Sequence, residues 1–262
     1  MTAAPAPKMT LYELVLKERI SIGPTDTGGI IHLITDEVAA AVTTALYNAA
    51  TATPPAGTMT PGAFVSLLFA WVRGESGFDP QAIDPNKDRA KPGETPQETF
   101  LHTDYGLGQY DGSELAGLFP DFEWEQQMAR AYDITWAAPY MVYTVLNLLA
   151  WADAQYEAFR AHGVTCPVSA NILAFEAYNA GHSGALGRAL KALDGKGASL
   201  AVAGGNIILA TDATVEQLAL TAEFISDAVL KDGTYFLYGH TVQSRWVEYL
   251  GLVGVDPVPG TP

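Results

Sequence analysis

The residues from Thr60 to Glu75 constrain the fold most strongly, because they have the full pattern of a buried helix. Thr60 suits the N-cap and Pro61 suits the first helical position. Glu75 ends a stripe of apolar residues that recur with the spacing of one helix face, at Phe64, Leu67, Leu68, Trp71 and Val72. A carboxylate at the end of an apolar face loses hydration when charged, so we expect its pKa to be raised. Glu75 would then hold a proton near neutral pH, as a general acid must.

Three short motifs occur in order along the chain. Residues 75–82 read E-S-G-F-D-P-Q-A, residues 105–109 read Y-G-L-G-Q, and residues 177–181 read A-Y-N-A-G. They resemble the signatures E-S-x-F-x-P-x-A, G-L-M-Q and A-Y-N-A-G of the lysozyme-like superfamily, in soluble lytic transglycosylases and goose-type lysozymes. The resemblance covers roughly residues 60–200 and implies a mostly α, lysozyme-like fold with a small irregular β element at most. It also implies cleavage of the β-1,4 bond between N-acetylmuramic acid and N-acetylglucosamine in peptidoglycan.

The same resemblance implies a role for each motif residue. Glu75 would be the general acid and base, with the Tyr178 hydroxyl orienting it. Contacts to the glycan strand or bracing of the site would come from Ser76, Gln109, Tyr105 and Asn179. Each has a plain structural alternative: a solvated or ion-paired Glu, a helix-end hydroxyl, a loop amide bonded to main chain, or a core aromatic. Glu176, just before the third motif, is a rival carboxylate that we expect to be a solvated helix position.

Two aspartates decide between the two reactions of this superfamily. Lytic transglycosylases use one Glu and leave an anhydro-sugar, whereas in goose-type lysozymes an Asp after G-L-M-Q holds the attacking water. Asp111 matches that position and Asp104 is a second candidate, although Asp-Gly is also a common turn signature. Gly108 departs from the Met of the motif, which would remove an apolar wall of a sugar subsite. We favour the transglycosylase, and hydrolysis stays open.

Composition excludes several other classes of function. The chain of 262 residues carries a formal net charge of −15, which disfavours binding to nucleic acid or an anionic membrane surface. No apolar run approaches the ~18 residues of a membrane span. A single Cys166 excludes an intrachain disulfide. The histidines lack metal-ligand spacing, so we expect neither a metal nor a cofactor.

The domain organisation follows from the limits of the resemblance. We expect an N-terminal helical extension over residues 1–59, a catalytic domain over 60–253 and a Pro/Gly tail over 254–262. Residues 84–99, polar and without periodicity, read as an inserted loop. The start of the chain lacks the pattern of a signal peptide, which favours phage lysis, a virion or an injection device as the route to the periplasm or cell wall. The rival interpretation is a catalytically silent, glycan-binding component of a phage tail or injection device, assembled with other proteins of that device.

Overall fold

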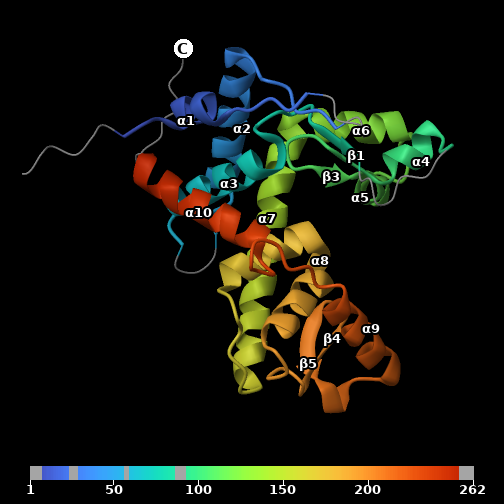
Figure 1. Cartoon of the computed structure of the whole chain (residues 1–262). Coiled ribbons are helices and arrows are strands. Elements are labelled where there is room, and N and C mark those ends of the chain that lie inside the picture. The colour runs from blue at the N-terminus through green and yellow to red at the C-terminus, as the bar shows by residue number, and fades with distance from the viewer. Residues whose placement is uncertain (1–7, 24–28, 56–58, 86–92, 254–262) are drawn as a thin grey trace, which may run out of the picture. The chain divides into compact units, whose positions relative to one another are not determined.

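The computed structural model describes residues 8–23, 29–55, 59–85 and 93–253, and it is mostly helical with two small antiparallel sheets, as Figure 1 shows. Contacts divide the chain into two compact units, Met1–Tyr143 with Trp246–Pro262, and Thr144–Arg245. The mostly α prediction is confirmed. The division into an extension and a catalytic domain stays a prediction, and the predicted tail lies outside the described residues.

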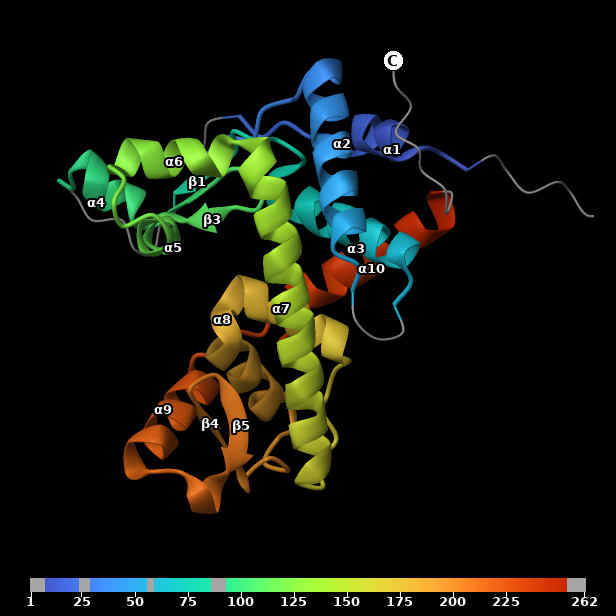
Figure 2. The same cartoon turned by 180° about the vertical axis from the view of Figure 1, so that it is seen from behind.

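The first unit begins with three helices, α1 (Leu11–Glu18), α2 (Asp36–Ala52) and α3 (Pro61–Ser76). Helix α2 lies against both α1 and α3, an arrangement that Figure 2 shows from behind. Thr10 and Glu13 form a capping box at the start of α1. At α3, the Thr60 hydroxyl accepts the backbone N–H of Ala63, and Pro61 is the first helical residue, as predicted. Trp71 at the centre of the apolar stripe is fully buried.

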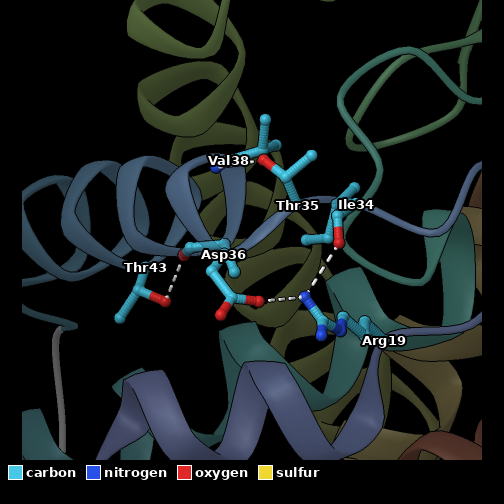
Figure 3. A network of polar contacts seen from close by, with 7 residues as sticks. Arg19, Ile34, Thr35, Asp36, Val38 and Thr43 are labelled. Carbon is cyan, nitrogen blue, oxygen red and sulfur yellow. Dashed lines mark hydrogen bonds and ion pairs between the residues drawn. The ribbon is translucent and has the colours of Figure 1, made fainter.

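In the described part of the segment between α1 and α2, Ile22 and Ile31 form an isolated antiparallel bridge, and Arg19 contacts the residues at the end of the segment. The Nη1 atom of Arg19 lies 2.9 Å from the Ile34 carbonyl oxygen and 2.7 Å from the Asp36 carboxylate (Figure 3). The hydroxyl of Thr35 accepts the backbone N–H of Val38 and so caps α2. One guanidinium therefore ties the segment that precedes α2 to the first turn of that helix.

A three-stranded antiparallel sheet follows α3, in the order β1 (Ile83–Pro85), β2 (Thr103–Tyr105), β3 (Tyr110–Asp111). The G-L-G-Q loop, residues 106–109, connects β2 to β3. The sheet contacts the short helices α5 (Gly112–Leu118) and α6 (Trp124–Tyr132). The inserted loop is more regular at its edges than predicted. β1 covers its first residues, and α4 (Pro96–Phe100) its last ones, because Thr95 and Glu98 form a capping box. Residues 86–92 of the insert lie outside the described residues.

Helix α7 (Ile134–Ala161) begins earlier than predicted. We expected Pro139 to open it, but Asp133 does so, since its carboxylate accepts the backbone N–H and the hydroxyl of Thr135. Pro139 lies in the second turn of the helix, where its missing N–H removes a single intrahelical hydrogen bond. α7 passes from the first unit into the second, and α10 (Leu237–Leu252) returns from the second unit to the first.

The second unit also contains α8 (Ala170–Ala192), the hairpin β4 (Leu200–Ala203) and β5 (Asn206–Leu209), the short 3-10 helix η1 (Ala210–Asp212) and α9 (Val215–Ser226). The hairpin was not predicted from the sequence. It packs against both α8 and α9, which also contact each other, and is drawn in orange in Figure 1. Within the described parts of the chain, no helix combines the length and the apolar character that a membrane span requires.

Candidate active site

Glu75 lies one residue before the end of α3, and its side chain is half-buried. The next residue, Ser76, is fully buried, and its hydroxyl donates a hydrogen bond to the Leu107 carbonyl oxygen at 2.8 Å. This bond joins the second residue of the first motif to the middle of the second motif. Because the Ser76 side chain has no exposed surface, we assign it to holding the 106–109 loop in place rather than to the predicted sugar contact.

The turn after Glu75 is fixed by a buried carboxylate. One oxygen of Asp79 accepts the backbone N–H of His32 at 2.7 Å and lies 2.8 Å from its Nδ1. The other oxygen accepts the backbone N–H of Gln81 at 2.8 Å. Asp79 is 2% exposed, so these bonds compensate for its burial. The contact between Asp79 and His32 connects the segment before α2 to the turn that follows Glu75.

The loop of the second motif is held by its own main chain. Gly106 has a φ of 74°, and a Cβ there would lie 2.2 Å from the carbonyl oxygen of Ala131, so only glycine fits. The side-chain Nε2 of Gln109 donates to the Gly106 carbonyl oxygen at 2.9 Å. Gln109 is half-buried and has the loop-amide role that we stated as the alternative, and its contact with the glycan stays a prediction.

Gly108 has a neighbour that sequence reasoning missed. A Cβ at Gly108 would lie 2.6 Å from Cζ of Tyr110, so the tyrosine ring occupies the space that a side chain at Gly108 would need. Tyr110 is 2% exposed, and its hydroxyl donates to the Ala137 carbonyl oxygen at 2.8 Å. The ring from two residues downstream therefore fills the space beside Gly108, and the loss of an apolar wall of a sugar subsite stays a prediction.

The two candidate aspartates are neighbours across the sheet. Asp104 pairs with Asp111 in β3 and with Asp84 in β1, so the three carboxylates share one face. Tyr105, predicted to contact substrate, pairs with residues 83 and 110 on the opposite face and is 5% exposed. One oxygen of Asp111 accepts the N–H and the hydroxyl of Ser113 at the start of α5. Asp111 is therefore a helix cap, and its role in holding water stays a prediction.

A fourth carboxyl group lies beside these three aspartates. Glu114 on α5 accepts a hydrogen bond from the hydroxyl of Tyr140 on α7 at 2.7 Å. The Tyr140 ring stacks on Trp136 at 4.8 Å between centroids and meets the Tyr110 ring edge-on at 5.3 Å. Glu114 is exposed as a residue, but desolvation of its carboxylate raises its pKa. The hydrogen bond from Tyr140 lowers the pKa of Glu114, and the charge of Asp111 raises it.

Sequence reasoning missed this group because its members come from separate elements. The phenol of Tyr110 has a pKa well above its usual value, first through burial and then through the charge of Glu114, the Tyr140 hydroxyl and the charge of Glu75. The charges of Glu75 and Glu114 therefore both act on the phenol of Tyr110. The only sequence signal for this group was the aromatic stripe on α7, where Trp136, Tyr140 and a further tyrosine recur at helical spacing.

The residues of the third motif lie in the second unit. Tyr178 is half-buried and Asn179 is exposed, just before a kink at Gly181 in α8. Glu75 belongs to the first unit, so the predicted contact between the Tyr178 hydroxyl and Glu75 stays a prediction. Glu176 is a correction: it is fully buried, not solvated.

Glu176 is buried because two groups satisfy its oxygens. One oxygen pairs with the guanidinium of Arg188, and the other accepts the backbone N–H of Gly239 at 2.7 Å. Arg188 lies beyond the kink of α8, and Gly239 lies in the first turn of α10. A Cβ at Gly239 would lie 2.8 Å from Ile172, so glycine allows this close approach. Glu176 is therefore a structural group of the second unit rather than a rival acid.

Within the described residues, no group of three or more His, Cys, Asp or Glu side chains is arranged to hold a metal ion. Comparison with protein-family models, with curated proteins and with solved structures gives no match for this chain. The arrangement of the site itself is therefore what supports a functional assignment.

Proposed function

We propose that the protein cleaves the β-1,4 bond between N-acetylmuramic acid and N-acetylglucosamine in peptidoglycan, with a lysozyme-like fold and Glu75 as the general acid. The observation that carries this proposal is the hydrogen bond from Ser76 to Leu107. It links two motifs that lie 31 residues apart and holds Glu75 at the edge of the 106–109 loop and its sheet.

The chemistry matches the position of Glu75. Cleavage of a glycosidic bond requires a proton on the departing oxygen while the ring passes through an oxocarbenium-like state. A half-buried carboxyl group on a rigid, buried helix can present that proton without moving. Positioned proton transfer of this kind contributes roughly 10²–10⁴-fold to a rate.

We favour a lytic transglycosylase over a hydrolase. In the transglycosylase, the same Glu75 that protonates the leaving oxygen then removes the proton from a hydroxyl of the substrate, which closes the anhydro-sugar ring. Hydrolysis by inversion needs a second carboxylate to activate water. The carboxylate expected to do so, Asp111, accepts two hydrogen bonds from Ser113 as a helix cap, which weakens the case for hydrolysis.

The test is mass spectrometry of the products released from purified peptidoglycan sacculi. We expect anhydromuropeptides from the wild-type protein, and a loss of about 10²-fold or more with Glu75→Gln. The matched control is Glu125→Gln, an exposed glutamate on α6, which should retain full activity. Products with reducing ends would make the enzyme a lysozyme. No products from the wild-type protein would refute the enzymatic proposal and favour the silent glycan-binding component.

A further inference from the structure

The first half of α7 carries a row of aromatic rings to which the proposed reaction gives no role. The rings of Trp136 and Tyr140 lie 4.8 Å apart between centroids, with an angle of 17° between their planes. Tyr140 and Tyr143 follow at 6.0 Å and 27°. The three residues have the spacing of one helix face and belong to the first unit. We call Trp136, Tyr140 and Tyr143 the aromatic row.

A buried ring supports the aromatic row from the interior of the first unit. Tyr110, which is 2% exposed, meets Trp136 edge-on at 5.4 Å and Tyr140 edge-on at 5.3 Å. Its hydroxyl donates to the Ala137 carbonyl oxygen at 2.8 Å, which fixes the ring. Edge-to-face contacts are a preferred arrangement of aromatic rings. The aromatic row therefore rests on an anchored floor.

The two ends of the aromatic row differ. Beyond Trp136, the rings continue edge-on to Phe119 at 5.3 Å, and Phe119 stacks on Phe122 at 5.6 Å. The guanidinium carbon of Arg130 lies over the Phe122 ring, 5.6 Å from its centroid, so a cation occupies this end. At the other end, Tyr143 is 60% exposed. Tyr143 therefore presents aromatic surface to the solvent.

Carboxylates accompany the aromatic row. Glu114 on α5 is exposed as a residue, and its carboxylate accepts a hydrogen bond from the Tyr140 hydroxyl at 2.7 Å. Asp121 and Glu123, both exposed, flank Phe122 in the sequence. An aromatic surface with a held carboxylate beside it can contact both an apolar face and the hydrogen-bond donors of one ligand.

This combination selects among the ligands that stack on aromatic rings. Carboxylates and a net charge of −15 repel phosphate, which disfavours nucleotides and nucleic acid. A sugar ring has a face of C–H bonds, which suits the electron-rich face of an aromatic ring. Its hydroxyl and N-acetyl amide hydrogens suit a carboxylate acceptor. An uncharged stretch of glycan therefore matches both features of the surface.

We propose that the aromatic row is a binding surface for a glycan strand. Tyr143 stacks on a sugar ring, and the Glu114 carboxylate accepts hydrogen bonds from the hydroxyl or amide groups of the sugar. The surface lies outside the three motifs, so it adds contacts to those that the motif residues are expected to make. The inference rests on the proposed function for the identity of the glycan, but binding can be measured without cleavage.

The variants are made in a Glu75→Gln background, so that the glycan is not consumed if the proposed function is right. Tyr143→Ala removes the exposed ring, whereas Tyr143→Phe keeps the ring without its hydroxyl. Glu114→Ala removes the acceptor. Tyr156→Ala is the matched control, because Tyr156 is a tyrosine of the same helix, is 37% exposed and belongs to the second unit.

Two probes measure binding by the full chain. One is purified peptidoglycan sacculi, by sedimentation at about 150 mM NaCl, where charges are screened over about 8 Å. The other is an uncharged hexamer of β-1,4-linked N-acetylglucosamine, by calorimetry. We expect Tyr143→Ala to bind both about 3- to 10-fold more weakly, and Glu114→Ala about 3-fold or more. Tyr143→Phe and Tyr156→Ala should bind like their parent, and thermal unfolding checks each fold.

The outcomes separate this proposal from the proposed function. Unchanged binding in Tyr143→Ala, or equal weakening in Tyr156→Ala, overturns the glycan surface, even if the wild-type protein releases muropeptides. Weaker binding in Tyr143→Ala without any products from the wild-type protein refutes the enzymatic function and retains the surface. Weaker binding together with products supports both.

Two further results would overturn parts of the proposal. Unchanged binding in Glu114→Ala refutes the role of its carboxylate. A proline-rich peptide is the other uncharged ligand that docks on exposed aromatic rings, so it is titrated in the same way. If that peptide bound through Tyr143 and the hexamer did not bind, the aromatic row would be a surface for a protein partner instead of a glycan.

Discussion

At the residue scale, Gly108 and Tyr110 show how one side chain depends on the absence of another. The Tyr110 ring lies where a side chain on Gly108 would lie, and its hydroxyl is anchored to the Ala137 carbonyl oxygen. Burial of the phenol raises its pKa, and the charges of Glu114 and Glu75 act in the same direction. A larger residue at Gly108 would have to displace the Tyr110 ring from this position.

We therefore expect Gly108→Ala to lower the free energy of unfolding by about 1–3 kcal/mol, the usual cost of overpacking a core. Gly117→Ala, in the neighbouring helix α5, is the matched control, because a Cβ there meets nothing within 4 Å. Urea unfolding of both variants measures the difference. In a double-mutant cycle, Tyr110→Val should remove most of the cost of Gly108→Ala. An equal cost with and without the ring would show that Tyr110 does not fill this space.

At the scale of elements, the sequence predicted those helices that begin with a cap and bury one clear face. α3 is the best example, with Thr60, Pro61 and an apolar stripe. The start of α7 was mispredicted because Pro139 is a strong signal and Asp133 a weaker one. The β4–β5 hairpin was missed because Leu200, Ala201 and Val202 are all buried, so the strand shows no alternation of apolar and polar residues.

The site was predictable only where a motif carried it. The apolar stripe placed Glu75 at the end of a buried helix, as the structure has it, and the role of the 106–109 loop in the site stays a prediction. It could not reveal the pair of Glu114 and Tyr140, whose members are 26 residues apart on different helices. Sequence reasoning also misassigned Glu176. The two groups that pair with its buried carboxylate, Arg188 and Gly239, come from distant segments.

The kink in α8 is the element-scale feature that follows the third motif. Gly181 has φ 70° and ψ 163°, a region that essentially only glycine populates. The predicted end of the helix is in fact this kink, after which the helix continues to Ala192. The ion pair of Glu176 and Arg188 joins the segments before and after it.

Gly181→Ala should therefore cost about 1–3 kcal/mol of unfolding free energy, through backbone strain alone. A Cβ at Gly181 meets nothing within 4 Å, so steric overlap does not contribute. Gly251→Ala in α10 is the control, since its site is equally open and its φ is not positive. Thermal unfolding followed by circular dichroism compares the two. If Gly181→Ala were as stable as the wild-type protein, the kink would not require a glycine.

At the scale of the whole molecule, the net charge of the protein has the same sign as that of the proposed substrate, so the two repel each other. The chain carries a formal net charge of −15. Three of its acidic residues, Asp84, Asp104 and Asp111, share one face of the sheet beside the site. Peptidoglycan with free peptide carboxylates is also anionic. Long-range repulsion between two anions slows their encounter and is screened by salt, with a Debye length of about 10 Å at 0.1 M.

Cleavage of sacculi should consequently become faster as salt is added, by about two-fold or more between roughly 10 and 150 mM NaCl. The rate of release of soluble muropeptides measures this. Sacculi whose carboxylates have been amidated are the control, because repulsion is then removed and the rate should depend little on salt. A rate that falls with salt would mean that a local cationic surface, rather than the net charge, governs the approach of the glycan. Equal salt dependence on native and amidated sacculi would show that substrate charge plays no part.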